Sequence, residues 1–145
     1  MSDELTILVI DDDEVDRLAV RRACKKSELS IKISEAENEQ TALHMIEGNI
    51  YDCILLDCRL GGTEGLHLLQ QIVTKDLSRA PIIMLSGVTD DTHMLQCLKE
   101  GAQDYLLKSE LSTSMLTRAI RYAKERIRIA EELRYVAQHD SLTGL

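Results

Sequence analysis

Four apolar segments of this sequence end in side chains that could bind a metal ion or a phosphoryl group. Three acids, Asp11–Asp13, follow the first segment, and Asp57 ends the second. Ser86 ends the third segment and Lys108 the fourth. Clustered carboxylates repel one another unless a cation lies among them, and oxygen ligands suit Mg²⁺. Because a lysine adds fixed positive charge and a serine hydroxyl can donate to an oxyanion, the set predicts phosphoryl transfer.

The segments that carry these side chains have the pattern of strands covered on both faces. Their apolar runs occupy residues 5–10, 53–56, 81–85 and 105–107, whereas Ile31 and Ile33 alternate with polar residues and indicate an edge strand. Helical spacing of apolar residues between the runs predicts three buried helix faces: Val15, Leu18, Ala19 and Ala23; Leu66, Leu69 and Val73; Met94, Leu95 and Leu98. Strands alternating with helices predict a doubly wound α/β fold, in which ligands gather at the carboxyl ends of the parallel strands.

From about Ser112 the pattern changes to a long helix. Apolar residues recur at alternating spacings of four and three, which is typical of a coiled-coil seam: Leu116, Ile120, Ala123, Ile127 and Ala130. Beyond Ala130 this seam would reach Arg134, while Ile129, Leu133 and Val136 carry a shifted phase, so either the register changes or the helix presents two faces. A helix continuing to His139 would be about 42 Å long and should project from the domain.

The sequence resembles the receiver domain of two-component response regulators over about residues 5–125. The matching motifs are Leu8-Val9-Ile10-Asp11-Asp12, Ile54-Leu55-Leu56-Asp57, Ile83-Met84-Leu85-Ser86-Gly87 and Asp104-Tyr105-Leu106-Leu107-Lys108. The resemblance implies a flavodoxin-like fold with five parallel strands in the order 2-1-3-4-5 and an extended C-terminal helix. It also implies that Asp57 accepts a phosphoryl group from a histidine kinase or a phosphotransfer protein.

The same resemblance implies roles for the residues around Asp57. Mg²⁺, for which Mn²⁺ can substitute, would be held by Asp12, Asp57 and the main-chain carbonyl of Arg59, with Asp11 reaching it through water. Lys108 would pair with the phosphoryl oxygens. Ser86, which precedes Gly87, would swing to bond one phosphoryl oxygen, and Tyr105 would change rotamer with it. The face formed by the fourth helix, the fifth strand and the fifth helix would then repack, and this face and the C-terminal helix would form a homodimer.

Two positions depart from the family pattern. Ser109 follows the strand-five lysine where the family usually has proline, and Gly61, followed by Gly62, lies four residues after the acceptor where proline is also common. Both changes predict more mobile loops. Arg59 is a bulky cation at a position that tunes the lifetime of the phosphoryl group in this family.

The last seven residues, from His139 to Leu145, resemble the opening of a GGDEF-type diguanylate cyclase domain. We therefore expect a receiver domain at residues 1–125, a signalling helix at 126–139 and the truncated start of an output domain at 140–145. The resemblance implies a cyclic di-GMP output. Catalysis by such a domain cannot reside in the residues given.

Composition excludes several other classes of protein. The net charge of −8 argues against a nucleic-acid partner, although residues 118–134 hold six basic and three acidic side chains. No apolar run approaches the length of a membrane span, and the acidic start lacks the features of a secretory signal, which predicts a cytoplasmic protein. The four cysteines lack metal-ligand spacing and are expected to be reduced and to fill apolar space.

Three alternatives remain open at this point. Asp11–Asp13 could simply cap the first helix, where acids are favoured. The sequence Asp11-x-Asp13-x-Val15 also resembles the nucleophile motif of haloacid-dehalogenase-type phosphatases, but the order of the other motifs is wrong and Asp57 would have no role. A receiver-like module that dimerises without phosphorylation is the third alternative.

Overall fold

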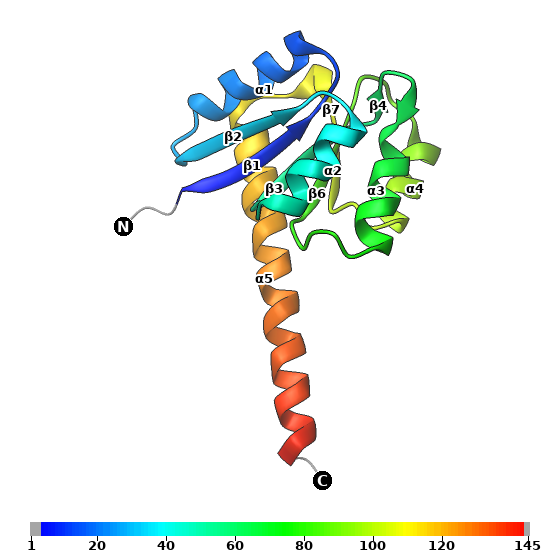
Figure 1. Cartoon of the computed structure of the whole chain (residues 1–145). Helices are drawn as coiled ribbons and strands as arrows, with labels where there is room; N and C mark the ends of the chain where they lie inside the picture. The colour runs from blue at the N-terminus through cyan, green and yellow to red at the C-terminus, as the bar shows by residue number, and fades with distance from the viewer. Residues whose placement is uncertain (1–3, 144–145) are drawn as a thin grey trace.

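The computed structural model describes the backbone of residues 4–143 and the side chains of residues 4–137. Five parallel strands form one sheet in the order β2-β1-β3-β6-β7. Their bounds are Leu5–Ile10 (β1), Ile31–Ala36 (β2), Cys53–Asp57 (β3), Ile82–Ser86 (β6) and Asp104–Leu107 (β7). The helices are α1 (Glu14–Lys25), α2 (Glu39–Gly48), α3 (Gly65–Thr74), α4 (Asp91–Lys99) and α5 (Thr113–Thr143). This topology confirms the predicted doubly wound, flavodoxin-like sheet and its projecting C-terminal helix (Figure 1).

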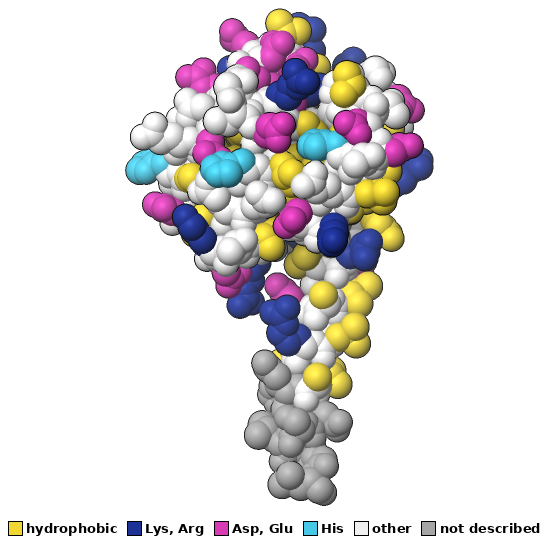
Figure 2. Space-filling view, turned by 90° about the vertical axis from the view of Figure 1, so that its right-hand side faces the viewer, with side chains coloured by type: hydrophobic (Ala, Val, Ile, Leu, Met, Phe, Trp, Pro, Cys, Tyr) yellow, Lys and Arg dark blue, Asp and Glu magenta, His cyan; other side chains and the backbone are white. Residues whose placement is uncertain are grey.

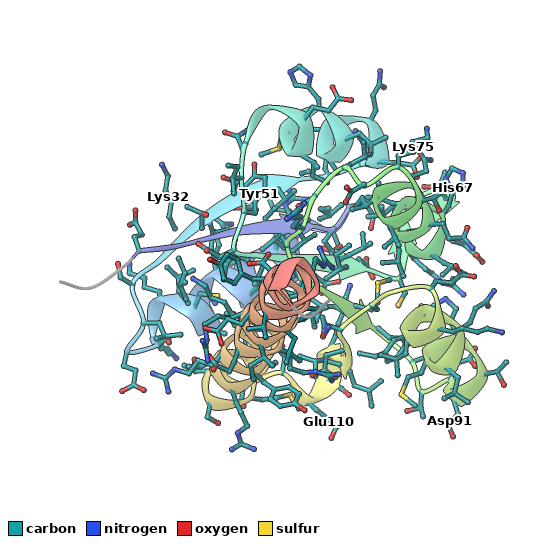
Figure 3. All side chains as sticks on the ribbon, turned by 90° about the horizontal axis from the view of Figure 1, so that it is seen from below. Lys32, Tyr51, His67, Lys75, Asp91 and Glu110 are labelled. Atoms are coloured by element: carbon teal, nitrogen blue, oxygen red, sulfur yellow. The ribbon has the colours of Figure 1, made fainter. Side chains whose placement is uncertain are left out.

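The sheet separates two apolar layers. Leu8 and Ile10 of β1 pack toward α2, α3 and α4, whereas Ile7 and Val9 pack toward α1 and α5. Every residue of β3 and β6 is buried, as expected for central strands of a doubly wound sheet. Figure 3, seen from below along α5, shows α1 and α5 on one side of the sheet and α2 and α3 on the other. Both layers hold the central strands in fixed register, so the residues that follow these strands are also fixed.

The helix faces differ in part from those that the sequence predicted. Val15 is 72% exposed and Leu95 is 64% exposed, while the buried residues are Val20 and Cys24 of α1 and Cys97 of α4. The apolar residues of α1 and α4 span more than one face, so their spacing alone does not show which face meets the sheet. The position of each helix relative to the strands determines which face is buried. On α4 this position leaves Leu95 in solvent.

The first part of the predicted coiled-coil seam lies inside the domain. Leu116, Ile120 and Ala123 are at most 2% exposed and pack in the layer that α1 shares with the sheet. The prediction that these three residues line a dimer seam is therefore wrong, because the sheet already covers them. α5 is one unbroken helix, and Leu133 on its shifted phase is 65% exposed. The buried phase and the exposed, shifted phase thus lie on two faces of one helix.

The second face of α5 continues along the projecting part of the helix. Its exposed large apolar side chains include Tyr122, Ile129, Leu133 and Val136. Figure 2 shows apolar side chains along one side of this projecting stem. The Arg126 guanidinium lies over the Tyr122 ring, with Cζ 5.6 Å from the ring centroid, while the exposed Ile129, Leu133 and Val136 are available to a partner.

The four cysteines are buried and free, which confirms that they fill apolar space. Burial raises the pKa of Cys24 and of Cys97 to about 11, so both thiols stay protonated near neutral pH. Cys58 is 8% exposed, although it adjoins Asp57.

Candidate functional site

The polar side chains predicted from the sequence meet at the carboxyl edge of the sheet. Asp11 follows β1 and Asp57 ends β3, and these two strands are neighbours at the point where the strand order reverses. One carboxylate oxygen each from Asp11, Asp12 and Asp57 lie within 4.8 Å of one another. Asp11 is 1% exposed and Asp57 is 6% exposed, whereas Asp12 faces solvent. Three convergent carboxylates, two of them buried, form a hard-oxygen donor set that fits Mg²⁺.

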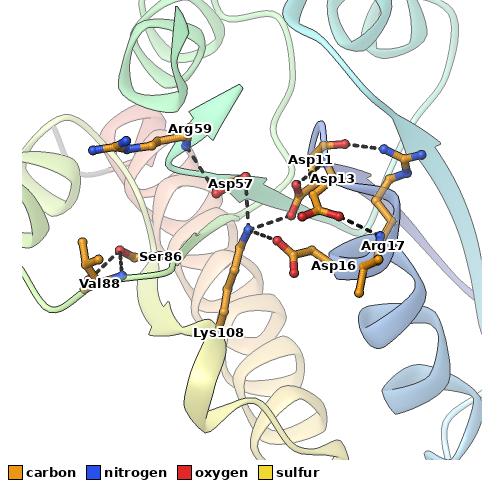
Figure 4. Close-up of polar contacts among 10 residues, drawn as sticks. Asp11, Asp13, Asp16, Arg17, Asp57, Arg59, Ser86, Val88 and Lys108 are labelled. Carbon is orange, nitrogen blue, oxygen red and sulfur yellow. Dashed lines mark hydrogen bonds and ion pairs between the residues drawn. The ribbon is translucent and has the colours of Figure 1, made fainter. Parts of the chain in front are cut away.

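Lys108, which follows β7, joins this acidic group (Figure 4). Its Nζ lies 2.9 Å from Asp11 Oδ2 and 3.1 Å from Asp57 Oδ2. A third carboxylate, from Asp16 in the first turn of α1, lies 2.7 Å from the same Nζ. Asp16 was not among the predicted site residues. Its only sequence signal is an acid four residues after Asp12 on the expected helix, which is also what a helix N-terminus favours.

The charges of this site shift the ionisation of its members. Burial, followed by the charge of Asp11, raises the pKa of Asp57 to about 6, although the charge of Lys108 and the Arg59 N–H oppose this shift. Burial alone would lower the pKa of Lys108, but hydrogen bonds to Asp16 and Asp11 more than offset it and raise that pKa. Lys108 is therefore a permanent cation, while the nearby charge of Asp11 makes Asp57 harder to ionise. A bound cation would favour the charged form of Asp57.

The Ser86 and Tyr105 side chains lie close to the acceptor but bond elsewhere. Ser86 is buried, and its Oγ donates to the Val88 carbonyl at 2.6 Å while accepting from the Val88 N–H at 3.2 Å. The Tyr105 hydroxyl lies 3.1 Å from Nδ1 of His93 on α4. The Ser86 hydroxyl is thus held by Val88, between β6 and α4, and the Tyr105 hydroxyl contacts His93 of α4. A swing of Ser86 or Tyr105 remains a prediction.

The segment after Asp57 forms a small antiparallel hairpin, β4 (Arg59–Leu60) and β5 (Thr63–Glu64). Gly61 in its turn has φ of 64°, a conformation that favours glycine, so the two glycines form the turn of this hairpin, and the mobility of the loop stays a prediction. The Arg59 N–H donates to Asp57 Oδ1 at 3.3 Å. Gly65 then packs so closely that an added Cβ would lie 2.1 Å from the Asp57 carbonyl oxygen.

The loop after β7 also has regular structure. Lys108–Glu110 form a short 3₁₀ helix, η1, which includes Ser109. The Leu111 N–H donates to the Lys108 carbonyl at 3.3 Å. The residue that stands where the family usually has proline is thus part of a hydrogen-bonded turn, and the greater mobility expected of this loop stays a prediction.

The fold and the site define an α/β domain with carboxylates and one lysine at the switch point of its sheet. The family model of the response regulator receiver domain matches residues 7–121. The transcriptional regulatory protein SrrA of Staphylococcus aureus is 32% identical over 108 residues, which are 74% of this chain and 42% of SrrA. The chain thus spans less than half the length of this relative.

Solved structures show the same architecture. A two-component response regulator from Clostridium difficile is 28% identical, with a TM-score of 0.75 and coverage of 85% of this chain and 98% of that one. A response regulator from Burkholderia pseudomallei, solved with a phosphorylated aspartic acid, a calcium ion and citrate, is 23% identical. Its TM-score is 0.72, and the match covers 97% of this chain and 86% of that one.

The chain belongs to the response regulator receiver domain family. Receiver domains are phosphorylated by histidine kinases and bind Mg²⁺ through an acidic pocket, and this chain has an acidic cluster of that kind. Among its described residues, no helix is both long enough and apolar enough to span a membrane. The family match is to receiver domains, and it gives the phosphatase interpretation no support.

Proposed function

We propose that this chain is a phosphorylation switch in which Asp57 accepts a phosphoryl group from the phosphohistidine of a kinase or phosphotransfer protein. The observation that carries the proposal is the meeting of Asp57 with two further carboxylates and with Lys108 at the sheet edge. Asp57 retains slight exposure, so a donor can reach its carboxylate, whereas Asp11 is almost completely enclosed. Of these two buried carboxylates, Asp57 is therefore the one open to transfer.

The acidic group would hold Mg²⁺, or Mn²⁺ in its place, through Asp12, Asp57 and the main-chain carbonyl of Arg59, with Asp11 acting through water. When bound, the cation neutralises charge on the phosphoryl oxygens during transfer. Lys108 would donate to a phosphoryl oxygen. The Ser86 hydroxyl would release the Val88 carbonyl and donate to a second phosphoryl oxygen. Gly87, the next residue, has open space beside it. The phosphorylated aspartic acid of the Burkholderia pseudomallei relative supports this assignment by analogy.

The test of this proposal is the intact mass of the chain after incubation with Mg²⁺ and acetyl phosphate. Wild type should gain one phosphoryl group, and Asp57→Asn should lose that gain. Asp11→Asn keeps Asp57 and serves as the matched control for a buried carboxylate. A gain that persists in Asp57→Asn but disappears in Asp11→Asn would support the phosphatase alternative, and no gain in wild type would support the phosphorylation-independent module.

We further propose that the signal leaves the domain through the face of α4, β7 and α5 and through the second face of α5. Val88 and Leu95 are each 64% exposed beside β7, and Leu133 is 65% exposed on the projecting helix. These apolar side chains favour a second copy of the chain as partner. Side chains at residues 140–145, where the cyclase-like start is expected, lie outside the described part, and a cyclic di-GMP output is proposed on sequence resemblance alone.

Light scattering with and without acetyl phosphate tests this dimer. Leu133→Glu should shift the chain toward monomer, because it places charge in the apolar face. Arg134→Glu, at the neighbouring exposed position outside that face, should leave the mass unchanged. Equal masses for wild type and Leu133→Glu under both conditions would contradict association through this face.

A further inference from the structure

The ammonium group of Lys108 contacts three carboxylates. Asp16 Oδ2 lies 2.7 Å away, Asp11 Oδ2 2.9 Å and Asp57 Oδ2 3.1 Å. Asp11 and Asp16 accept hydrogen bonds and so use two of its three N–H donors, whereas Asp57 forms an ion pair with it. Figure 4 shows the three acids converging on Nζ, with Asp16 approaching from α1. A phosphoryl group on Asp57 must therefore share the charge of Lys108 with carboxylates that already pair with it.

The three carboxylates differ in how easily they can leave. The side chain of Asp11 is 1% exposed and that of Asp57 is 8% exposed, so neither can turn into water. The side chain of Asp16 is 36% exposed, and it lies on the first turn of α1 beside solvent. Burial of an unpaired charge is costly, whereas an exposed carboxylate can exchange its partner for water. Asp16 is thus the partner that Lys108 can lose at least cost.

We propose that Asp16 is a positioning residue that competes with the phosphoryl group for Lys108 and so limits phosphorylation of Asp57. This inference rests on the proposed function. In the transfer step, a bond forms between an Asp57 carboxylate oxygen and phosphorus, and the bond from phosphorus to the donor breaks with its electron pair on the donor. Lys108 then donates to a phosphoryl oxygen instead of to Asp16, which turns to solvent without forming a covalent bond.

The charge of Asp16 determines how much it should change the rate of phosphorylation of Asp57. The Asp16 and Asp57 oxygens contact the same Nζ, so they lie within about 6 Å, where a unit charge alters a rate by roughly threefold to tenfold at the dielectric constant of a solvent-facing site. The acceptor site already contains three other carboxylates and one lysine. Removing the fourth negative charge should favour approach of an anionic phosphodonor.

The experiment measures the rate of phosphorylation of the full chain by acetyl phosphate at saturating Mg²⁺. Asp16→Asn keeps the shape of the side chain and should react about three to ten times faster than wild type. Asp16→Glu restores the charge and should return the rate toward that of wild type. Glu14→Gln is the matched control, because it removes the same charge from the same helix turn at an exposed residue with no contact to Lys108 in the described structure.

Salt dependence separates a charge effect from a structural one. Raising the ionic strength to 1 M shortens the Debye length to about 3 Å, so the ratio of the Asp16→Asn rate to the wild-type rate should fall toward one. A disturbed α1 would leave a ratio that does not change with salt.

Several outcomes overturn the inference. An Asp16→Asn rate that equals or falls below the wild-type rate would show that Asp16 does not compete for Lys108. An equal acceleration in Glu14→Gln would assign the effect to the net charge of the helix turn. If wild type itself gains no phosphoryl group on Asp57, the proposed function fails first, which separates that failure from the failure of the Asp16 inference.

Discussion

The carboxyl edge of the sheet and the projecting part of α5 are stabilised in opposite ways. At the sheet edge, Lys108 contacts Asp11 across 97 residues of sequence, and both lie on elements fixed by the core. On the projecting helix, Arg128 pairs with Glu125 and Glu132, three and four residues away on the same helix. The site geometry is therefore a property of the whole fold, whereas the outer helix has local contacts and an uncovered apolar face.

The same contrast divides α5 itself. Its first three turns cover the sheet through Leu116, Ile120 and Ala123. Farther along, Ile129 and Leu133 continue a heptad-like pattern into solvent. One helix thus carries a face whose partner is inside the domain and a face whose partner is a proposed second chain.

The largest expected effect is a loss of stability that tests the division of α5 into a buried and an exposed part. Leu116→Ala should lower the free energy of unfolding by about 3 kcal/mol, because Leu116 is 1% exposed and its loss leaves a cavity. Leu133→Ala makes the same change on the exposed part of the same helix and should alter the free energy of unfolding of the monomer by less than about 0.5 kcal/mol. Urea denaturation at low protein concentration measures both. Similar losses for the two variants would contradict the division of α5.

A second prediction concerns the close packing beneath the acceptor. Gly65→Ala should cost about 2–3 kcal/mol of unfolding free energy, because its Cβ would press on the Asp57 carbonyl oxygen. Gly48→Ala is the matched control, since an added Cβ there meets nothing within 4 Å. Denaturant melts of both variants measure the difference. A tolerated Gly65→Ala would mean that the segment after Asp57 can shift, and that the site is less rigid than its contacts indicate.

The raised pKa of Asp57 predicts that the free energy of unfolding depends on pH. The outer part of α5 should not contribute to this dependence. The folded pKa of about 6 lies above the ordinary value of 3.8, so the folded chain binds this proton more tightly than the unfolded chain. Stability from this group is therefore full below about pH 4 and is lost as pH rises through about 6, by at most about 3 kcal/mol and by less where solvent screens the charge. Melts in metal-free buffer should show this loss in wild type and not in Asp57→Asn. A parallel pH profile for the two proteins would contradict the shift.

The smallest expected effect concerns the contact between the Ser27 and Thr117 hydroxyls, near the point where α5 leaves the domain. The Ser27 Oγ lies 2.9 Å from the Thr117 Oγ1 and joins the end of α1 to the buried part of α5. Thr117→Val should lower the free energy of unfolding by about 1 kcal/mol through the lost hydrogen bond. A double-mutant cycle with Ser27→Ala isolates this interaction. Strict additivity of the two changes would show that the hydroxyls do not stabilise each other.

Local patterns in the sequence determined much of the fold. Central strands are covered on both faces, so their apolar runs could be recognised, and the strand order followed from the motifs that resemble a receiver domain. The end of each run also located Asp11, Asp57, Ser86 and Lys108, because the carboxyl ends of parallel strands meet at one edge. The roles of these residues in phosphoryl transfer remain predictions.

Only the tertiary structure decided which surfaces meet. Heptad spacing is the same for a helix that packs on its own sheet and for one that packs on a partner, so the spacing could not assign Leu116 to the core or Leu133 to solvent. The contact of Asp16 with Lys108 depends on how distant segments approach. Spacing along the chain determines which residues share a face, and packing of the complete chain determines what each face contacts.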